Sequence, residues 1–123
     1  MTAMLILVGG GAGAVARWLI THLVTTTQRR NNTTGRWTLA LATTIVNVLG
    51  SFVLGFIVGM AEGDLPPGAA PISIGVLGGF TTFSTWMVEA DEAEGTTATV
   101  AVLTVPAVLG VAAATAGIAI GRL

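Results

Sequence analysis

The hydroxyl residues that follow a pair of glycines are the part of this sequence best suited to chemistry. The adjacent glycines Gly78 and Gly79 cost a helix about 2 kcal/mol relative to alanine, and Thr or Ser side chains can cap a helix that starts again. The hydroxyl residues are Thr81, Thr82, Ser84 and Thr85. The pattern predicts a helix broken near Gly78–Thr81, where freed carbonyls can hold a cation and the restarted helix presents its positive end. The alternative is a packing site whose hydroxyls bond back to the i−4 carbonyls.

A second group of polar residues recurs at helical spacing. Thr43, Asn47 and Ser51 lie four residues apart, so they share one helix face over about 12 Å. A lone membrane Asn such as Asn47 more often joins helices than binds a ligand, whereas a stripe of three donors is typical of a wet pathway. The sequence leaves pore lining and interhelical bonding equally open.

Three titratable residues lie within or at the ends of apolar stretches. An arginine inside a membrane span is by default a functional candidate, but Arg17 is interpreted as structural: it either reaches the interface or bonds helix-end carbonyls in a neighbouring subunit. His22 is expected at the membrane interface. Glu89 ends its stretch, so we expect it either at a vestibule mouth or as the start of the acidic linker that follows.

The elements that must position these residues are membrane helices. Of the 123 residues, 53% are hydrophobic and 9% charged, with a mean hydropathy of +0.86; soluble domains carry about 25% charged residues. This composition excludes a soluble enzyme. There is no cysteine, so thiolate chemistry is excluded too, and a net charge of −1 gives no footprint for nucleic acid. A span needs ~20 apolar residues, which predicts one domain over 1–123 with four spans, at about 4–24, 37–61, 69–90 and 97–121.

Each span contains two glycines four residues apart. In membranes this spacing lets helices approach closely, and we interpret most of these pairs as packing faces. The pairs are Gly9/Gly13, Gly55/Gly59, Gly75/Gly79 and Gly117/Gly121. The third span differs from the others because about ten residues lie on each side of its expected break, which places the break near the bilayer midplane.

The arginines give a first indication of orientation. Four spans place both termini and the Glu62–Gly68 loop on one side, with Arg122. The other side has Arg29, Arg30 and Arg36. The positive-inside rule then predicts both termini outside the cell.

The polar groups inside the spans are donors without a carboxylate. Proton-coupled transport normally needs a buried Asp or Glu, and the six acids all lie at span ends or in loops. Hydroxyls, an amide, arginine and the positive edges of Phe rings suit a small anion whose water they replace, as carbonyls do for cations in channel filters. The alternatives are a non-conducting scaffold or assembly subunit, and a small four-span multidrug transporter, whose first-span carboxylate is missing here.

The sequence resembles the Fluc/CrcB family of fluoride channels along its whole length. The resemblance rests on a glycine-rich start leading to Arg17, a polar stretch in the second span, and a long and unusual run in the third span that precedes Glu89. These segments are Gly9-Gly10-Gly11-Ala12-Gly13-Ala14, Val46-Asn47-Val48-Leu49-Gly50-Ser51-Phe52 and Gly78-Gly79-Phe80-Thr81-Thr82-Phe83-Ser84-Thr85.

The resemblance implies an all-α membrane protein that forms a dual-topology, antiparallel dimer in the plasma membrane. It implies a sodium ion at the dimer centre, held by the backbone carbonyls of Gly78 and Thr81. It also implies passive fluoride export along pathways lined by the Asn47 amide, the Phe83 ring edge and the third-span hydroxyls, Ser84 and Thr85.

Two departures from the family pattern bear on the partner. Trp86 stands where a second Phe is usual, so its indole N–H adds a donor while its bulk can block a narrow path. In the fourth span, where a hydroxyl track at four-residue spacing is usual, Thr104 and Thr115 lie eleven residues apart with mainly Ala, Val and Gly between them. Both departures and the arginine bias favour a heterodimer with a paralogous subunit of opposite orientation, and a homodimer is the alternative.

Overall fold

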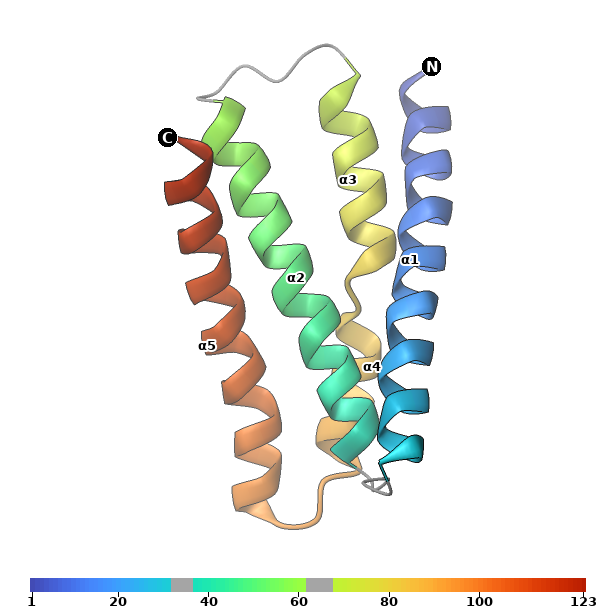
Figure 1. Ribbon diagram of the computed structural model, residues 1–123, viewed down its shortest axis with the longest axis vertical. Helices are drawn as coiled ribbons and strands as arrows, with labels where there is room; N and C mark the ends of the chain where they lie inside the picture. The colour runs from blue at the N-terminus through green and yellow to red at the C-terminus, as the bar shows by residue number, and fades with distance from the viewer. Residues whose placement is uncertain (32–36, 62–67) are drawn as a thin grey trace.

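The computed structural model describes residues 1–31, 37–61 and 68–123 as a bundle of helices (Figure 1). The helices are α1 (Thr2–Arg30), α2 (Trp37–Ala61), α3 (Ala69–Phe80), α4 (Phe83–Asp91) and α5 (Thr96–Gly121). Successive helices run in opposite directions, except that α4 continues the course of α3, and the two termini lie at the same end (Figure 1). The basic last turn of α1, with Arg29 and Arg30, lies at the opposite end. Two parts of the sequence-based prediction, Arg36 and the helix-breaking segment 62–67, lie outside the described residues.

Three helices are long and apolar enough to cross a membrane: Thr2–Arg30, Thr38–Ala61 and Thr96–Gly121. These correspond to the predicted first, second and fourth spans. The predicted third span, 69–90, is occupied by α3 and α4, whose 12 and 9 residues reach only about 18 Å and about 14 Å. Neither helix alone matches the roughly 30 Å hydrocarbon core.

The first helix is longer than its predicted span. The predicted span ended near residue 24, but α1 continues to Arg30. The Thr25 hydroxyl donates to the Thr21 carbonyl at 2.9 Å within the helix, and the two arginines of the last turn stabilise the negative end of the helix dipole. The polar residues after Val24 therefore belong to the last turns of α1 and do not mark the start of a loop.

Glycine pairs join α1 to α3. A Cβ added at Gly9 would lie 2.7 Å from the Ile72 carbonyl oxygen, and one at Gly13 would lie 2.8 Å from the Phe80 nitrogen. Side chains do not tolerate such contacts with backbone, so only glycine permits this approach. Facing them, Gly75 and Gly79 are equally closed in by α1 backbone.

Glycine pairs also join α2 to α5. A Cβ at Gly59 would lie 3.0 Å from the Ile118 Cα, and one at Gly117 would lie 2.8 Å from the Phe56 nitrogen. Gly55 and Gly121 also face backbone of the opposite helix. The interpretation of the four spaced glycine pairs as packing faces is confirmed, and the bundle is built as two tight pairs, α1 with α3 and α2 with α5.

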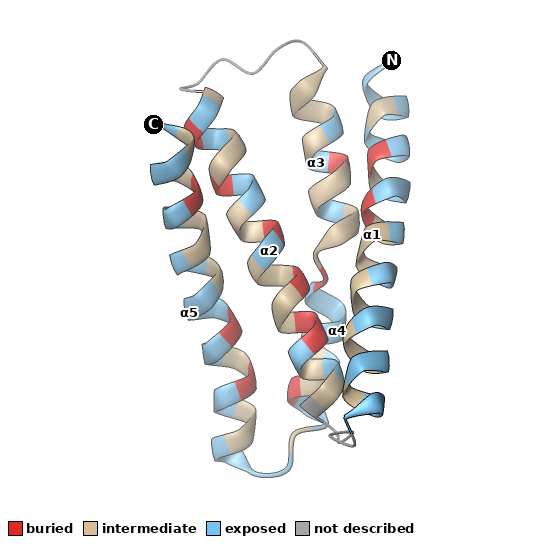
Figure 2. Cartoon of the chain, in the orientation of Figure 1, coloured by how far each residue is buried: buried red, intermediate tan, exposed pale blue. Residues whose placement is uncertain are grey.

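Little of the chain is buried. The buried hydrophobic residues in the described part are Ala42, Val46, Ala90 and Val102, and the outer faces of α1 and α5 are largely exposed (Figure 2). Large apolar side chains such as Leu7, Val108 and Val111 are among those exposed. An apolar surface of this extent needs lipid or another protein against it.

Candidate functional site

The helix interruption lies at Thr81 and Thr82. α3 ends at Phe80 and α4 begins at Phe83, with both intervening residues in extended conformation (φ/ψ −75°/157° and −142°/118°). The break was expected to include Gly78, but the glycine pair is helical, because Gly79 is needed where α3 lies against the Gly10 backbone. The interruption therefore comes after the glycines, at the hydroxyl residues.

The two threonine hydroxyls at the interruption differ in role: one caps the new helix and the other bonds back to a carbonyl of the preceding helix, and the sequence left both roles open. Thr82 caps α4, since its Oγ1 accepts from the Thr85 amide at 3.3 Å, and it donates to the Thr85 hydroxyl at 2.9 Å. Thr81 bonds back, donating to the Leu77 carbonyl at 2.8 Å. One hydroxyl thus starts the new helix while the other closes the old one.

Asn47 holds the interruption open from α2. Its Nδ2 donates to the Thr82 carbonyl at 3.0 Å, and its Oδ1 accepts from the Thr82 amide at 2.9 Å. In a continuous helix that amide would donate to the Gly78 carbonyl four residues earlier. The Asn47 side chain therefore replaces a helical hydrogen bond. This contact is of the interhelical kind, which was one of the two interpretations of Asn47 that the sequence left open.

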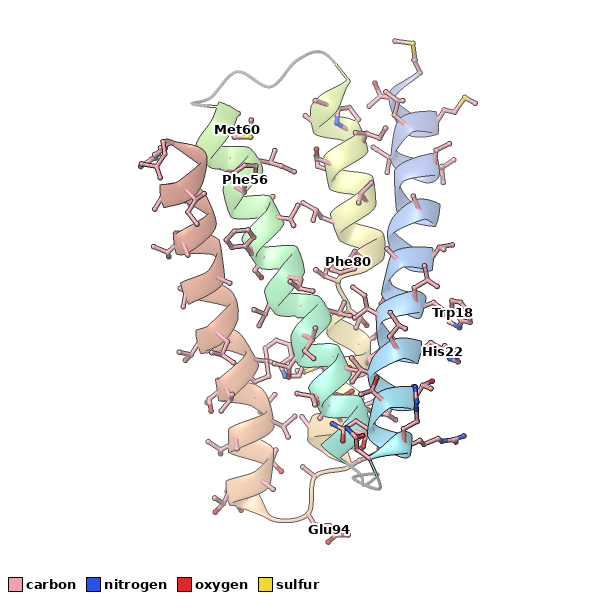
Figure 3. The ribbon with its side chains drawn as sticks, in the orientation of Figure 1. Trp18, His22, Phe56, Met60, Phe80 and Glu94 are labelled. Atoms are coloured by element: carbon pink, nitrogen blue, oxygen red, sulfur yellow. The ribbon has the colours of Figure 1, made fainter. Side chains whose placement is uncertain are left out.

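Arg17 reaches the same interruption from α1. Its Nη1 lies 3.4 Å from the Thr81 carbonyl oxygen, so the helix-end carbonyl that it contacts belongs to its own chain. His22, one helical turn beyond Trp18, is exposed and stacks on that ring, with centroids 5.4 Å apart (Figure 3). His22 therefore points outward, and its place at the membrane interface stays a prediction.

A groove of about 720 Å³ opens beside the interruption. Its floor is α2 and its walls are α3, α4 and α5; α3 and α5 do not touch each other within the described ranges. The groove is lined by Asn47, Gly50, Ser51, Leu54, Ile74, Leu77, Gly78, Thr81, Thr82, Phe83, Trp86, Pro106, Ala107, Gly110, Val111 and Ala114.

Six of the predicted site residues meet in this groove, and five lie elsewhere. Those in the groove are Asn47, Ser51, Gly78, Thr81, Phe83 and Trp86. Ser84 and Thr85 are exposed on the first turn of α4, and Arg17 lies behind the interruption on α1. Thr43 is buried and donates to the Glu89 carboxylate at 2.5 Å. Thr43 therefore ties α2 to α4, whereas Asn47 and Ser51 of the same stripe reach the groove.

Trp86 does not offer its indole N–H to the groove. Its Nε1 donates to the Val102 carbonyl of α5 at 2.6 Å, so the expected extra donor is occupied. Its ring meets the Phe83 ring at an interplanar angle of 88° with centroids 5.8 Å apart. Phe83 itself is 68% exposed, so this ring projects from the protein surface at the groove.

α5 also contributes to this site, although none of its residues was among the predicted site residues. Pro106 and Gly110 line the groove, and a Cβ at Gly110 would lie 3.3 Å from the Ser51 hydroxyl. A proline in a membrane helix frees a carbonyl one turn earlier, which was a signal available in the sequence. Thr104 and Thr115 bond to carbonyls of their own helix, at 2.7 Å and 2.9 Å.

The oxygen atoms that could hold a cation here are backbone carbonyls. Across residues 1–31, 37–61 and 68–123, no three His, Asp or Glu side chains come together as a metal site. The Gly78 carbonyl has lost its helical donor to Asn47, and it lies near the negative end of the α3 dipole. The Thr81 carbonyl oxygen already accepts a hydrogen bond from Arg17.

Comparison with known proteins decides the family. The family described as "CrcB-like protein, Camphor Resistance (CrcB)" matches residues 4–118. The chain belongs to the CrcB family. CrcB relatives include one from Staphylococcus epidermidis named "Fluoride-specific ion channel FluC 2", which is 44% identical over 85 residues, 69% of this chain and 66% of the relative.

Two further CrcB relatives carry related names. One from Mycobacterium tuberculosis, also named "Fluoride-specific ion channel FluC 2", is 38% identical over 112 residues, 88% of this chain and 81% of its own length. One from Corynebacterium jeikeium, named "Fluoride-specific ion channel FluC 1", is 39% identical over 95 residues, 66% of this chain and 62% of its own. The match to the staphylococcal relative thus spans just under two thirds of that protein.

Family membership and the three long apolar helices together make this CrcB chain a multi-pass membrane protein. The relatives are named as ion channels and not as enzymes, in agreement with the composition, which excluded a soluble enzyme.

Proposed function

We propose that this chain is a subunit of a fluoride-selective channel through which cytoplasmic fluoride leaves the cell passively. The observation that carries the proposal is the groove at the Thr81–Thr82 interruption, where an amide, hydroxyls and an aromatic edge meet without a carboxylate. Donors of this kind replace the hydration shell of a small anion. The names of the relatives support fluoride as that anion.

Within this proposal, α3 and α4 cross the membrane as one interrupted span. Together with the two extended residues between them they reach about 38 Å, which is enough to cross the hydrocarbon core of roughly 30 Å. Irregular backbone at membrane depth is tolerated only inside protein or beside water. The position of the interruption, near the middle of this span, supports a site at the bilayer midplane.

The groove requires a second subunit. It has a floor and walls within one chain, but a pathway through the membrane must also be covered, because lipid cannot solvate an ion. We expect an antiparallel dimer in which the grooves face each other across the seam. Ser84 and Thr85, exposed on α4, then join Asn47, Ser51 and Phe83 along the pathway. The second Nδ2 hydrogen of Asn47 is its free donor.

The carbonyls at the interruption are suited to a sodium ion at the seam. Sodium prefers oxygen ligands, and Gly78 and Thr81 both face the groove, the former without its helical donor. Two carbonyls from each of two subunits would hold the ion and neutralise the ends of two α3 dipoles. Arg17 contacts the same Thr81 carbonyl, so it positions that oxygen from the opposite side.

The partner is a paralogous subunit or a second copy of this chain. The relatives named FluC 1 and FluC 2, together with Trp86, support a heterodimer. Reconstitution of this chain by itself separates the alternatives, because robust fluoride efflux from the single chain would exclude the need for a paralogue.

The proposed activity is tested by fluoride efflux from liposomes, for the chain alone and with a paralogous subunit. The variant Phe83→Ile removes the ring edge at the groove, and Phe56→Ile, which makes the same change outside the groove lining, is its matched control. The proposal predicts fluoride efflux that Phe83→Ile abolishes and Phe56→Ile retains. If the wild-type chain showed no fluoride efflux, either alone or with a paralogous subunit, the scaffold alternative would be supported instead.

A further inference from the structure

Pro106 leaves α5 with a carbonyl that its own helix cannot satisfy. Proline has no backbone N–H, and its ring pushes against the carbonyl four residues earlier. In α5 that carbonyl belongs to Val102, which is buried, as is Pro106. In the interior of a membrane protein an unpaired carbonyl is costly, so this position requires a donor from another helix.

Trp86 of α4 supplies that donor. Its indole Nε1 lies 2.6 Å from the Val102 oxygen, a short N–H···O distance. A phenylalanine at position 86 would occupy similar space but would leave the carbonyl unpaired. The presence of tryptophan here is therefore matched to the proline in the neighbouring helix.

The hydrogen bond fixes the part of α4 that lies beside the groove. α4 has only nine residues, and hydrogen bonds tie both of its ends to α2, through Asn47 with Thr82 and through Thr43 with Glu89. Trp86 ties its middle to α5. Because the Trp86 ring packs edge-to-face with Phe83, fixing the indole also fixes the exposed ring at the groove.

We propose that Trp86 and Pro106 form one positioning device, in which the proline frees the Val102 carbonyl and the indole N–H binds it, so that the Phe83 ring is held in place at the groove. Trp86 is thus a positioning residue whose donor points away from the anion. Its effect on fluoride efflux rests on the proposed channel function, whereas its hydrogen bond does not.

The test is a cycle of four chains: wild type, Trp86→Phe, Pro106→Ala and the double variant, each purified in detergent and reconstituted in liposomes. Pro106→Ala returns a helical N–H to the Val102 carbonyl, which gives this carbonyl a donor from its own helix. Loss of one hydrogen bond to a buried carbonyl changes the equilibrium between the fixed and the displaced indole ring by at least about fivefold. We therefore expect Trp86→Phe to lower fluoride efflux by about fivefold or more when Pro106 is present, and by less than about twofold in the Pro106→Ala background.

The spectroscopic readout is hydrogen exchange of the indole N–H groups by NMR, with the Trp86 signal assigned as the one missing in Trp86→Phe. We expect this signal to be protected in the wild type and to exchange at least about fivefold faster in Pro106→Ala. Trp18→Phe, a change on the exposed face of α1, is the control and should leave it unaltered.

Two results would overturn the proposal: a Trp86→Phe effect of equal size in both backgrounds, or an indole exchange rate that Pro106→Ala does not change. The exchange measurement does not depend on conduction. A wild type without efflux would therefore refute the channel function while the indole signal still decides the hydrogen bond.

Discussion

Asn47→Leu tests how the interruption between α3 and α4 is maintained. The change keeps the approximate size of the side chain but removes the donor and the acceptor that hold the Thr82 backbone at 3.0 Å and 2.9 Å. Each unpaired buried backbone group costs about 1–3 kcal/mol, which gives about 2–6 kcal/mol for both. The Thr82 amide can recover part of this by rejoining the Gly78 carbonyl, so we expect a loss of about 2–3 kcal/mol in the free energy of unfolding.

The assay pairs unfolding of the purified protein in mixed detergent micelles with fluoride efflux from liposomes. Thr115→Val is the control, because the Thr115 hydroxyl bonds only to the Val111 carbonyl of its own helix and its removal should change stability by less than about 0.5 kcal/mol. We expect Asn47→Leu to abolish efflux, because the regularised backbone closes the site. If Asn47→Leu matched Thr115→Val in stability and efflux, the account of the interruption would be refuted.

Three further substitutions probe the packing around the site. Gly13→Ala should destabilise the protein by about 1–3 kcal/mol, since the added Cβ meets α3 backbone, whereas Gly11→Ala, with nothing within 4 Å, should be neutral; equal unfolding free energies would contradict the helix pairing. Gly78→Ala also meets nothing within 4 Å in its own chain but faces the groove, so it should weaken dimerisation measured by analytical ultracentrifugation; wild-type dimerisation would argue against the seam. Thr43→Val removes the donor to Glu89 and should cost about 1–3 kcal/mol of stability; an unchanged unfolding midpoint would show that the contact is not stabilising.

The residue types and their spacing predicted much of the fold. Apolar length alone located the three long helices, and the four glycine spacings correctly predicted where helices meet, because only glycine lets two backbones come so close. The sequence also predicted an interruption within residues 69–90, because the Gly78–Gly79 pair disfavours a helix and the hydroxyl residues after it can cap a new one.

The exact place of the interruption depended on tertiary packing. Local propensity pointed to Gly78, but Gly79 is held helical by its contact with α1, and Asn47 captures the amide of Thr82 instead. The sequence could not distinguish pore lining from interhelical bonding at Asn47, because both use the same side-chain donor and differ in whether a pathway or another helix faces it.

The hydrogen-bond partner of Trp86 likewise could not be predicted from the sequence. The sequence left open whether its indole N–H adds a donor to the pathway or its bulk blocks it, and in the structure this N–H binds the Val102 carbonyl that Pro106 frees. Each residue had a known local property, namely a free indole N–H and a missing backbone N–H. That the two properties match could be seen only once α4 and α5 were placed side by side.

The proposed fluoride channel is tested most directly by comparing fluoride efflux with chloride efflux from liposomes that contain the wild-type chain, alone and together with a paralogous subunit. Fluoride is followed with a fluoride-selective electrode and chloride with a chloride electrode under the same ionic gradient. The account predicts rapid fluoride efflux in at least one of the two preparations, with chloride retained. Efflux of both ions at similar rates, or retention of fluoride in both preparations, would contradict it.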